Sequence, residues 1–343
     1  MAYCNKVIAS KQSQHHMTGC EVEEKDYWLA DGRTTFRDVF VYQNAEESIL
    51  ELQVNTNDRK QALCQYYNRV ASGNAAPYFY ASNIFKYGSE TQVFKEPVTT
   101  DWRGLMSTYN KDKTVGDFTG EEIRKYVSDN RNYMPSTTEA SPETKTRAYN
   151  ATGYHQNYIV YRLTDVMLMK AEALTGLAML SSAGGDEEAG SGTMELLESA
   201  FDMVRIVNAR SLENESDSLK WTAKYQTTAA MEELVLNERL RELCFEGKRW
   251  YDLLRYNYRH VEGVDYTTTL ADQDERGVAF VGTYKAMLDQ MKRKLSGMGD
   301  AVASKMSTEP RLYLPVSETD VKICPALKQM PTYSSDKTIS KDY

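Results

Sequence analysis

The spacing of apolar residues predicts several helices. In YIVYRLTDVMLMKAEAL, residues 158–174, apolar positions recur at steps of three and four, which is the spacing of one helix face. The same spacing predicts a helix from Met194 to about Arg210, and a linker of Ser, Gly and acidic residues joins the two into a helical hairpin. Further helices are expected in residues 1–10 and in TYKAMLDQMKRKL, before an extended tail with three prolines.

A third long helix is predicted from roughly Ala229 to Tyr256. Its apolar seam repeats at steps of four and three residues through Leu236, Leu240, Leu243, Gly247, Trp250 and Leu254. Glycine costs about 1 kcal/mol relative to alanine inside a helix, so Gly247 indicates that a backbone or a bulky ring approaches closely.

The first half of the chain shows less periodicity. Alternating apolar and polar residues in FRDVFVYQ and SILELQV, between Phe36 and Val54, predict two short strands that pair around an acidic turn. Residues 55–157 contain no long periodic segment and are rich in Gly, Pro, Ser, Thr and Asn. Long irregular segments of this kind commonly carry function, so we expect the ligand surface here.

The charged residues of ERLRELCFEGKRWYDLLRYN are spaced for pairing along the third helix. Glu238 and Arg241 are three residues apart, as are Arg239 with Glu242, Glu246 with Arg249, and Asp252 with Arg255. This spacing predicts salt bridges on exposed helix flanks, each worth a few tenths of a kcal/mol. A catalytic carboxylate pair is disfavoured because arginines neutralise these groups.

Composition disfavours several classes of function. The net charge of −8 opposes nucleic-acid binding, and no run of about 18 apolar residues that would span a bilayer occurs. The five cysteines are scattered without a C-x-x-C pair, and the four histidines have no metal-ligand spacing. No nucleophile, phosphate-binding or dinucleotide motif is present. We therefore expect neither a catalytic residue nor a metal or other cofactor.

The aromatic residues are the remaining candidates for function. The chain has 24 Tyr and 4 Trp against 9 Phe, which favours partly wet binding surfaces over a dry core. We predict stacking on sugar rings by Trp28, Tyr78, Tyr80 and Trp102. We predict hydrogen bonds to sugar hydroxyls from Asn57, Asp58 and Arg103.

Four ordered segments identify a family resemblance: YRLTDVMLMKAEAL, IVNARS, ERLRELCFEGKRWYDLLRYN and LYLPVSETDVKICPALKQMPTY. Their order and spacing resemble the SusD/RagB family of Bacteroidetes outer-membrane nutrient-binding lipoproteins, with EESILELQV and DWRGLMSTY as weaker matches. The resemblance implies a mainly α-helical fold, with tetratricopeptide-like helix pairs as scaffold, long irregular loops and a few short strands. It implies a single domain over residues 1–343, with the ligand-binding insertion at about 55–157 and the helical scaffold and tail at 158–333.

The resemblance also implies a function and a partner. Such a protein captures oligosaccharide or polysaccharide at the cell surface, without hydrolysing it, for a SusC-like TonB-dependent transporter. Peptide binding, as in some relatives, and a helical interaction scaffold without a small-molecule site are the alternatives, and a hydrolase is a more remote one. Family members usually begin with a lipid-modified cysteine and further helices, so we expect this chain to correspond to the C-terminal two thirds, with a lipid anchor upstream.

Overall fold

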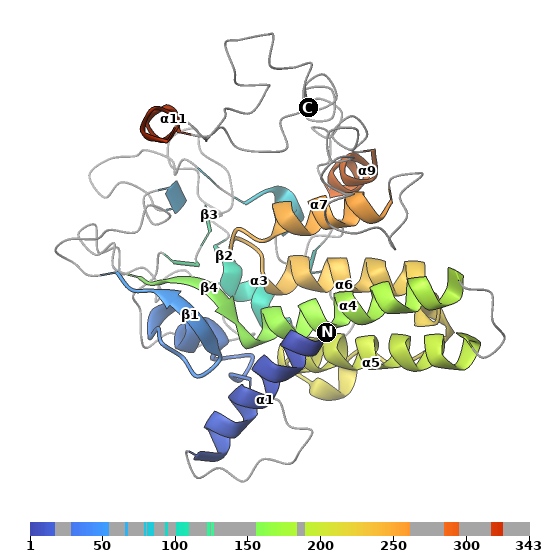
Figure 1. Cartoon of the computed structure of the whole chain (residues 1–343). Coiled ribbons are helices and arrows are strands. Elements are labelled where there is room, and N and C mark those ends of the chain that lie inside the picture. Colours follow the sequence, from blue (N-terminus) through green and yellow to red (C-terminus); the bar gives the residue numbers. More distant parts are fainter. Residues whose placement is uncertain are drawn as a thin grey trace. The chain divides into compact units, whose positions relative to one another are not determined.

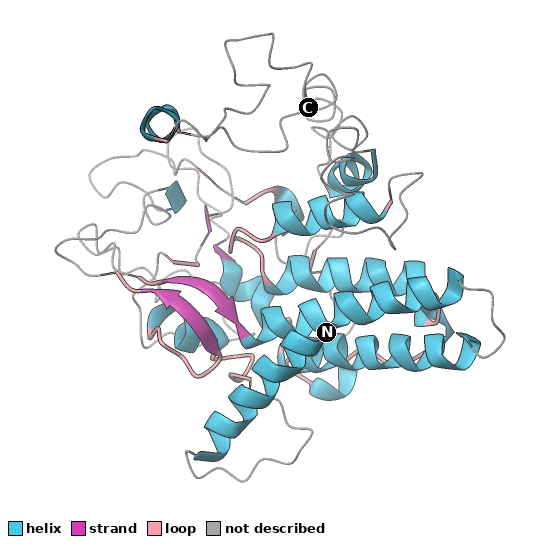
Figure 2. Cartoon of the chain, viewed as in Figure 1, coloured by secondary structure: helices cyan, strands magenta, loops and turns pink. Residues whose placement is uncertain are grey.

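The computed structural model describes residues 1–17, 29–54, 66–67, 79, 81–85, 93–94, 101–109, 122–123, 125–126, 156–183, 189–260, 285–294 and 317–324. Helices account for 66% of these residues, so the fold is mainly α-helical, as the sequence predicts (Figures 1 and 2). The chain divides into two compact units, Met1–Arg249 and Trp250–Tyr343. A single domain over residues 1–343 stays a prediction.

The first unit is built on a layer of long helices. It contains α1 (Ala2–Met17), α3 (Trp102–Ser107), α4 (Leu163–Ala183), α5 (Ala189–Arg210) and α6 (Thr228–Glu242), with short helices η1 (Phe36–Val41), η2 (Asn83–Phe85), η4 (Glu215–Asp217) and η5 (Ala223–Tyr225). In Figure 1, α4, α5 and α6 lie side by side and α1 packs against α4. The helices predicted near residues 1–10 and 194–210 are confirmed.

The core of this unit lies where α4, α5 and α6 meet. Its side chains with 0–1% exposure are Met167, Leu168, Ala171, Ala178, Leu197, Ala200, Phe201, Val204, Val207 and Met231. Burying such side chains away from water is the main favourable term in folding. The apolar spacing in the sequence therefore identified the correct face of α4 and α5.

A two-stranded antiparallel sheet precedes α4. Strand β1 (Ser48–Leu52) pairs with β4 (Tyr158–Arg162), and β2 (Thr108–Tyr109) pairs with β3 (Glu122–Ile123). The prediction that residues 158–162 begin a helix is wrong, because they form β4 and α4 starts at Leu163. Figure 2 shows β4 continuing directly into α4.

The strand predicted in FRDVFVYQ is also wrong. Residues Phe36–Val41 form the π-helix η1, and β1 pairs with β4 instead. Three consecutive residues, Val39, Phe40 and Val41, are 1–5% exposed. A strand with one solvated face would bury alternate residues, so this burial suits a helical turn that is enclosed on several sides.

The long helix predicted from Ala229 to Tyr256 is broken. Thr227 caps the start of α6 by accepting a hydrogen bond from the N–H of Ala230 at 3.2 Å, and α6 ends at Glu242. Phe245 and Gly247 then have φ values of 65° and 75°, which a right-handed helix does not allow. A Cβ on Gly247 would lie 3.2 Å from the hydroxyl oxygen of Tyr158. The close approach of a ring is thus found, but in a turn rather than within a helix.

The second unit contains α7 (Arg249–Arg259, which starts at the unit boundary), α9 (Lys285–Lys294) and α11 (Glu318–Ile323). The amide oxygen of Asn257 accepts from the N–H of Met287 at 3.2 Å, and Leu253, Leu254 and Met287 form a small apolar cluster. The helix predicted in TYKAMLDQMKRKL is confirmed by α9. The tail predicted as extended contains α11 within its described part.

Candidate functional site

Helix α3 begins with two of the predicted ligand-binding residues, Trp102 and Arg103. The N–H of Trp102 donates to the carbonyl of Ser211 at 2.9 Å, and Asp101 forms a β-bridge with Leu212. The start of α3 is therefore fixed to the segment that follows α5. The Trp102 side chain is 7% exposed and packs in an apolar cluster with η1, so only a small part of the indole is accessible.

Trp102 also lines a pocket beside the end of α5. The pocket has a volume of about 340 Å³, at the low end of the range of roughly 300–1,000 Å³ for small-molecule pockets. Its lining residues are Asp31, Gly32, Arg33, Trp102, Arg210, Leu212, Glu213 and Glu215. We call this the Trp102 pocket. It combines an aromatic ring with hydrogen-bond donors and acceptors.

The turn at residues 31–35 forms one wall of the pocket. The carboxylate of Asp31 accepts from the N–H of Arg33 at 2.9 Å, and its carbonyl accepts from the N–H of Thr35 at 2.7 Å. The guanidinium carbon of Arg33 lies 5.7 Å from the ring centre of Trp102, which is a cation–π distance. A Cβ on Gly32 would lie 1.9 Å from the carbonyl oxygen of Arg210, so this contact requires glycine.

Arg210, whose carbonyl contacts Gly32, uses most of its guanidinium N–H groups in hydrogen bonds and ion pairs. Its Nη1 donates to the carbonyl of Ala30 at 2.9 Å and to Thr35 and Glu47 at 3.1 Å, and its Nη2 pairs with Glu242. The Arg210 side chain is 9% exposed, and its Nε has no hydrogen-bond partner within the described part of the chain. This Nε is itself buried, and leaving such a donor without an acceptor costs about 1–3 kcal/mol.

Arg103 lies in buried ion pairs. Its Nε and Nη2 donate to the carboxylate of Asp101 at 2.9 and 2.7 Å, and its Nη1 donates to Glu238 at 2.6 Å and to Glu242 at 3.1 Å. The side chain is 8% exposed. A ligand contact by Arg103 would therefore have to replace one of these ion pairs.

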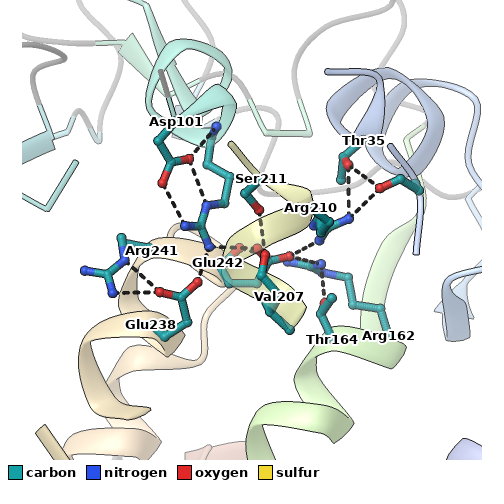
Figure 3. Close-up of polar contacts among 12 residues, drawn as sticks. Thr35, Asp101, Arg162, Thr164, Val207, Arg210, Ser211, Glu238, Arg241 and Glu242 are labelled. Atoms are coloured by element: carbon teal, nitrogen blue, oxygen red, sulfur yellow. Dashed lines mark hydrogen bonds and ion pairs between the residues drawn. The ribbon is translucent and has the colours of Figure 1, made fainter. Parts of the chain in front are cut away.

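These residues belong to a larger cluster that we call the buried ion network. Its members are Glu47, Asp101, Arg103, Lys125, Arg162, Arg210, Glu238, Arg241, Glu242 and Glu246. Figure 3 shows Glu242 between Arg162 and Arg210, and it also pairs with Arg103. The five carboxylates balance the five cations, which lowers the cost of burying each charge.

Arg162 connects the strands to the helices within this network. Its Nη1 pairs with Glu47 at 2.8 Å and with Glu242 at 2.6 Å, while its Nη2 pairs with Glu246 at 2.9 Å. Lys125 pairs with Glu246 at 2.7 Å. One residue of β4 thus holds the segment before β1 and the C-terminal end of α6 together.

The prediction of exposed salt bridges along residues 238–255 is wrong for most of these residues. Glu238, Glu242 and Glu246 are 0–2% exposed and bind partners from distant parts of the chain. Arg239 pairs with Asp165 at 3.0 Å in the same buried manner. The expected short-range pairs form between Glu238 and Arg241 at 2.6 Å and between Asp252 and Arg255 at 2.7 Å.

Burial and charge act in opposite directions on the network carboxylates. Burial alone would raise the pKa of Glu242, but the charges of Arg210, Arg162 and Arg103 outweigh it and hold this pKa well below its ordinary value. The pKa of Glu47 is lowered in the same way by Arg210 and Arg162, against the effect of burial. Such carboxylates remain ionised near neutral pH, which suits a structural role better than proton transfer.

Five of the predicted ligand-binding residues lie outside the described residues: Trp28, Asn57, Asp58, Tyr78 and Tyr80. A described fragment of the same region contains an exposed ring pair. Phe79 and Tyr66 are 55% and 43% exposed, their ring centres lie 5.3 Å apart, and the N–H of Phe79 donates to the carbonyl of Tyr66 at 3.0 Å. Tyr67 is fixed by a hydrogen bond of 3.2 Å to the carbonyl of Phe245, and burial raises its pKa to about 12.

Two further properties hold for the described residues. They include no group of three or more His, Cys, Asp or Glu residues that could hold a metal ion. Their helices include none that is both long enough and apolar enough to cross a lipid bilayer.

Among the predicted ligand-binding residues, Trp102 lines this pocket, and the sequence singled out none of the other lining residues as ligand-binding. Asp31 and Gly32 form a D-G dipeptide, which is a turn signal that could have drawn attention to this segment. Glu213 and Glu215 follow α5 in an acidic run. Nothing in the local sequence indicates that these two segments meet, because the contact depends on how α5 packs.

Comparison with known proteins gives one family. Residues 24–333 match the family described as the SusD family, SusD_RagB. The SusD-like protein P38 of Formosa agariphila is 30% identical over 149 residues, which cover 40% of this chain and 26% of that protein.

A solved structure has a similar fold. A SusD superfamily protein from Bacteroides vulgatus has a TM-score of 0.52 at 14% identity, covering 97% of this chain and 59% of that one. Another, from Bacteroides fragilis, has a TM-score of 0.46 at 19% identity, covering 90% of this chain and 56% of that one. The chain therefore spans about a quarter of the curated relative and less than two thirds of these structures.

Proposed function

The chain belongs to the SusD family, and we propose on this basis that it binds oligosaccharide or polysaccharide at the outer-membrane surface without hydrolysing it. In this proposal the bound glycan passes to a SusC-like TonB-dependent transporter. The observation that carries the proposal is the match to the family over residues 24–333.

The Trp102 pocket supports a glycan as the ligand. The small accessible part of the Trp102 indole is apolar, which suits contact with the C–H side of a sugar ring, and the surrounding Asp31, Arg33 and Glu213 provide the donors and acceptors that sugar hydroxyls need. We propose that Trp102 contributes stacking, together with Trp28, Tyr78 and Tyr80. Asn57, Asp58 and Arg103 remain the proposed polar contacts.

A non-catalytic role agrees with the chemistry of the carboxylates in the buried ion network. In the buried ion network they are paired with arginine or lysine, and their pKa values are lowered for Glu47, Glu238, Glu242 and Glu246 despite burial. Glycoside hydrolysis needs one carboxylic acid with a raised pKa beside a second, ionised carboxylate.

Calorimetry with a panel of soluble oligosaccharides tests the proposal. Binding by the unmodified protein is expected, and Trp102→Ala should weaken it about 5- to 10-fold if one ring contributes roughly 1 kcal/mol or slightly more. Because Trp102 is packed in a cluster, Trp102→Phe is included as a variant that keeps an aromatic ring. Tyr3→Ala is the matched control, since Tyr3 is an 83% exposed ring outside the pocket lining.

Four results would contradict parts of this proposal. No binding across the panel would remove the glycan assignment, and binding of peptides instead would favour the peptide-binding alternative. Release of new reducing ends from polysaccharide would show hydrolysis. Unchanged affinity in Trp102→Ala, Trp102→Phe and Tyr80→Ala would place the site elsewhere.

A further inference from the structure

We propose that the Trp102 pocket binds the terminal residue of a glycan without acidic groups, and that its carboxylates exclude uronate and sulfated sugars. This inference rests on the proposed function and specifies the ligand class of the same site. The structure supports it through the size of the pocket, its hydrogen-bonding groups and its charge.

The volume limits how much of a glycan can enter. About 340 Å³ is near the lower end of the range of roughly 300–1,000 Å³ for small-molecule pockets, so it has room for one or two sugar rings. An extended polysaccharide crossing the site would need a longer groove. The pocket therefore suits the end of a chain, or a short branch.

The hydrogen-bonding groups suit vicinal hydroxyls. A hydroxyl both donates and accepts, and the exposed guanidinium of Arg33 in the lining supplies N–H donors. The neighbouring side-chain carboxylates of Asp31 and Glu213 supply acceptors. A sugar with adjacent hydroxyls can therefore bridge the two kinds of group.

Arg33 gives the site a cationic donor beside its aromatic ring. Its side chain is exposed, and its guanidinium lies 5.7 Å from the Trp102 ring centre. A cation–π contact at an exposed site contributes about 0.5–1 kcal/mol. The guanidinium therefore lies where it can donate to an oxygen of a sugar that enters beside the ring.

The charge of the lining disfavours an acidic ligand. Asp31, Glu213 and Glu215 are exposed carboxylates, whereas Arg210 is already paired with Glu47 and Glu242. Arg33 alone then opposes three negative charges. At about 4 Å in water, one like charge weakens binding roughly fivefold, and more where solvent is partly excluded.

Matched trisaccharides test this inference on the full chain. The probes are neutral trisaccharides of glucose, mannose, galactose and xylose, with trigalacturonate as the acidic counterpart of galactotriose. We expect at least one neutral trisaccharide to bind at least tenfold more tightly than trigalacturonate in low salt. Raising the salt concentration should narrow this ratio, because screening weakens the repulsion.

Two variants assign the selectivity to the pocket. The double variant Glu213→Gln with Glu215→Gln should narrow the ratio of neutral to acidic affinity at least fivefold. The matched control, Glu195→Gln with Glu198→Gln, changes two exposed carboxylates of α5 outside the lining and should leave the ratio within twofold. Affinity should also change less than threefold between a trisaccharide and the corresponding hexasaccharide.

The outcomes separate this inference from the proposed function. If no glycan binds, the proposed function fails and the inference fails with it. If glycans bind but trigalacturonate binds as tightly as the neutral probes, or the Glu213 and Glu215 variant keeps the ratio, only the inference is overturned. A tenfold gain from trisaccharide to hexasaccharide would overturn recognition of a chain end.

Discussion

Replacing Glu242 by glutamine tests how far the buried ion network stabilises the first unit. The Glu242 carboxylate is 2% exposed and binds three arginines: Arg162 at 2.6 Å, Arg103 at 3.1 Å and Arg210. Glutamine keeps the shape and one acceptor, but it removes the charge and turns N–H donors toward guanidinium groups.

The size of the expected loss in stability depends on which carboxylate partners the arginines keep. Removing one partner of a buried ion pair costs about 3–5 kcal/mol, because the remaining charge is left uncompensated. Arg162 keeps Glu47 and Glu246, Arg210 keeps Glu47, and Arg103 keeps Asp101 and Glu238. We therefore expect the free energy of unfolding to fall by about 3 kcal/mol, at the lower end of this range.

Urea unfolding followed by circular dichroism measures this change. The matched control is Asp202→Asn, which breaks a 3.4 Å pair with Arg205 whose side chains are 43–50% exposed. An exposed pair contributes about 1 kcal/mol or less, so the control should retain nearly full stability. A loss in Glu242→Gln within 1 kcal/mol of the control would refute the reasoning.

Three further predictions concern pH, glycine and helix capping. The pKa values of Glu47, Glu238, Glu242 and Glu246 are lowered on folding. Their contribution to the free energy of unfolding is therefore fully present above about pH 4.3, and it is lost as the pH falls through the pKa values of the folded state. Urea midpoints should therefore drop steeply below about pH 4. Gly247→Ala should destabilise by about 1–2 kcal/mol because φ is +75°, whereas Gly176→Ala, in α4 with open space, should stabilise by up to about 1 kcal/mol. Thr227→Ala should lower the free energy of unfolding by about 1 kcal/mol, because it removes the hydroxyl that accepts from the N–H of Ala230, whereas Thr227→Ser should retain most of that stability.

Each of these predictions has a contradicting result. A urea midpoint that stays constant from pH 6 to pH 3 would mean that the network carboxylates have ordinary pKa values. If alanine changed the stability equally at Gly247 and at Gly176, the positive φ of Gly247 would not explain the expected loss. Equal stability of the alanine and serine variants at Thr227 would show that its hydroxyl does not stabilise α6.

The sequence predicted the long helices because their apolar spacing is set by local geometry. It failed at β4 because Ile159, Leu163 and Val166 continue one helical spacing across the boundary between strand and helix. Pairing with β1 overrides that spacing, since Glu51 lies opposite Ile159 in the register. The pairing depends on a segment about 100 residues earlier in the chain, which a local pattern cannot contain.

The candidate site was less predictable than the fold. Trp102 was selected because an aromatic residue in an irregular segment is a recognisable signal; it lines a pocket, and its role in binding stays a prediction. The sequence around Arg103 does not distinguish an exposed polar side chain from a buried one, and in the structure Arg103 binds three buried carboxylates. The spacing of Glu238, Glu242 and Glu246 is the same for an exposed face and for a buried one, so spacing alone cannot decide between them.

The buried ion network also has a consequence for the lifetime of the folded protein. Its pairs join residues far apart in sequence: Arg162 lies 115 residues from Glu47 and 80 from Glu242, and Arg103 lies 135 from Glu238. Closing such long loops costs entropy before any pair can form, so we expect these contacts to arise after the transition state for folding. Interactions formed that late mainly slow unfolding and hardly change the folding rate. The network would then lower the unfolding rate and so lengthen the time for which the first unit stays folded.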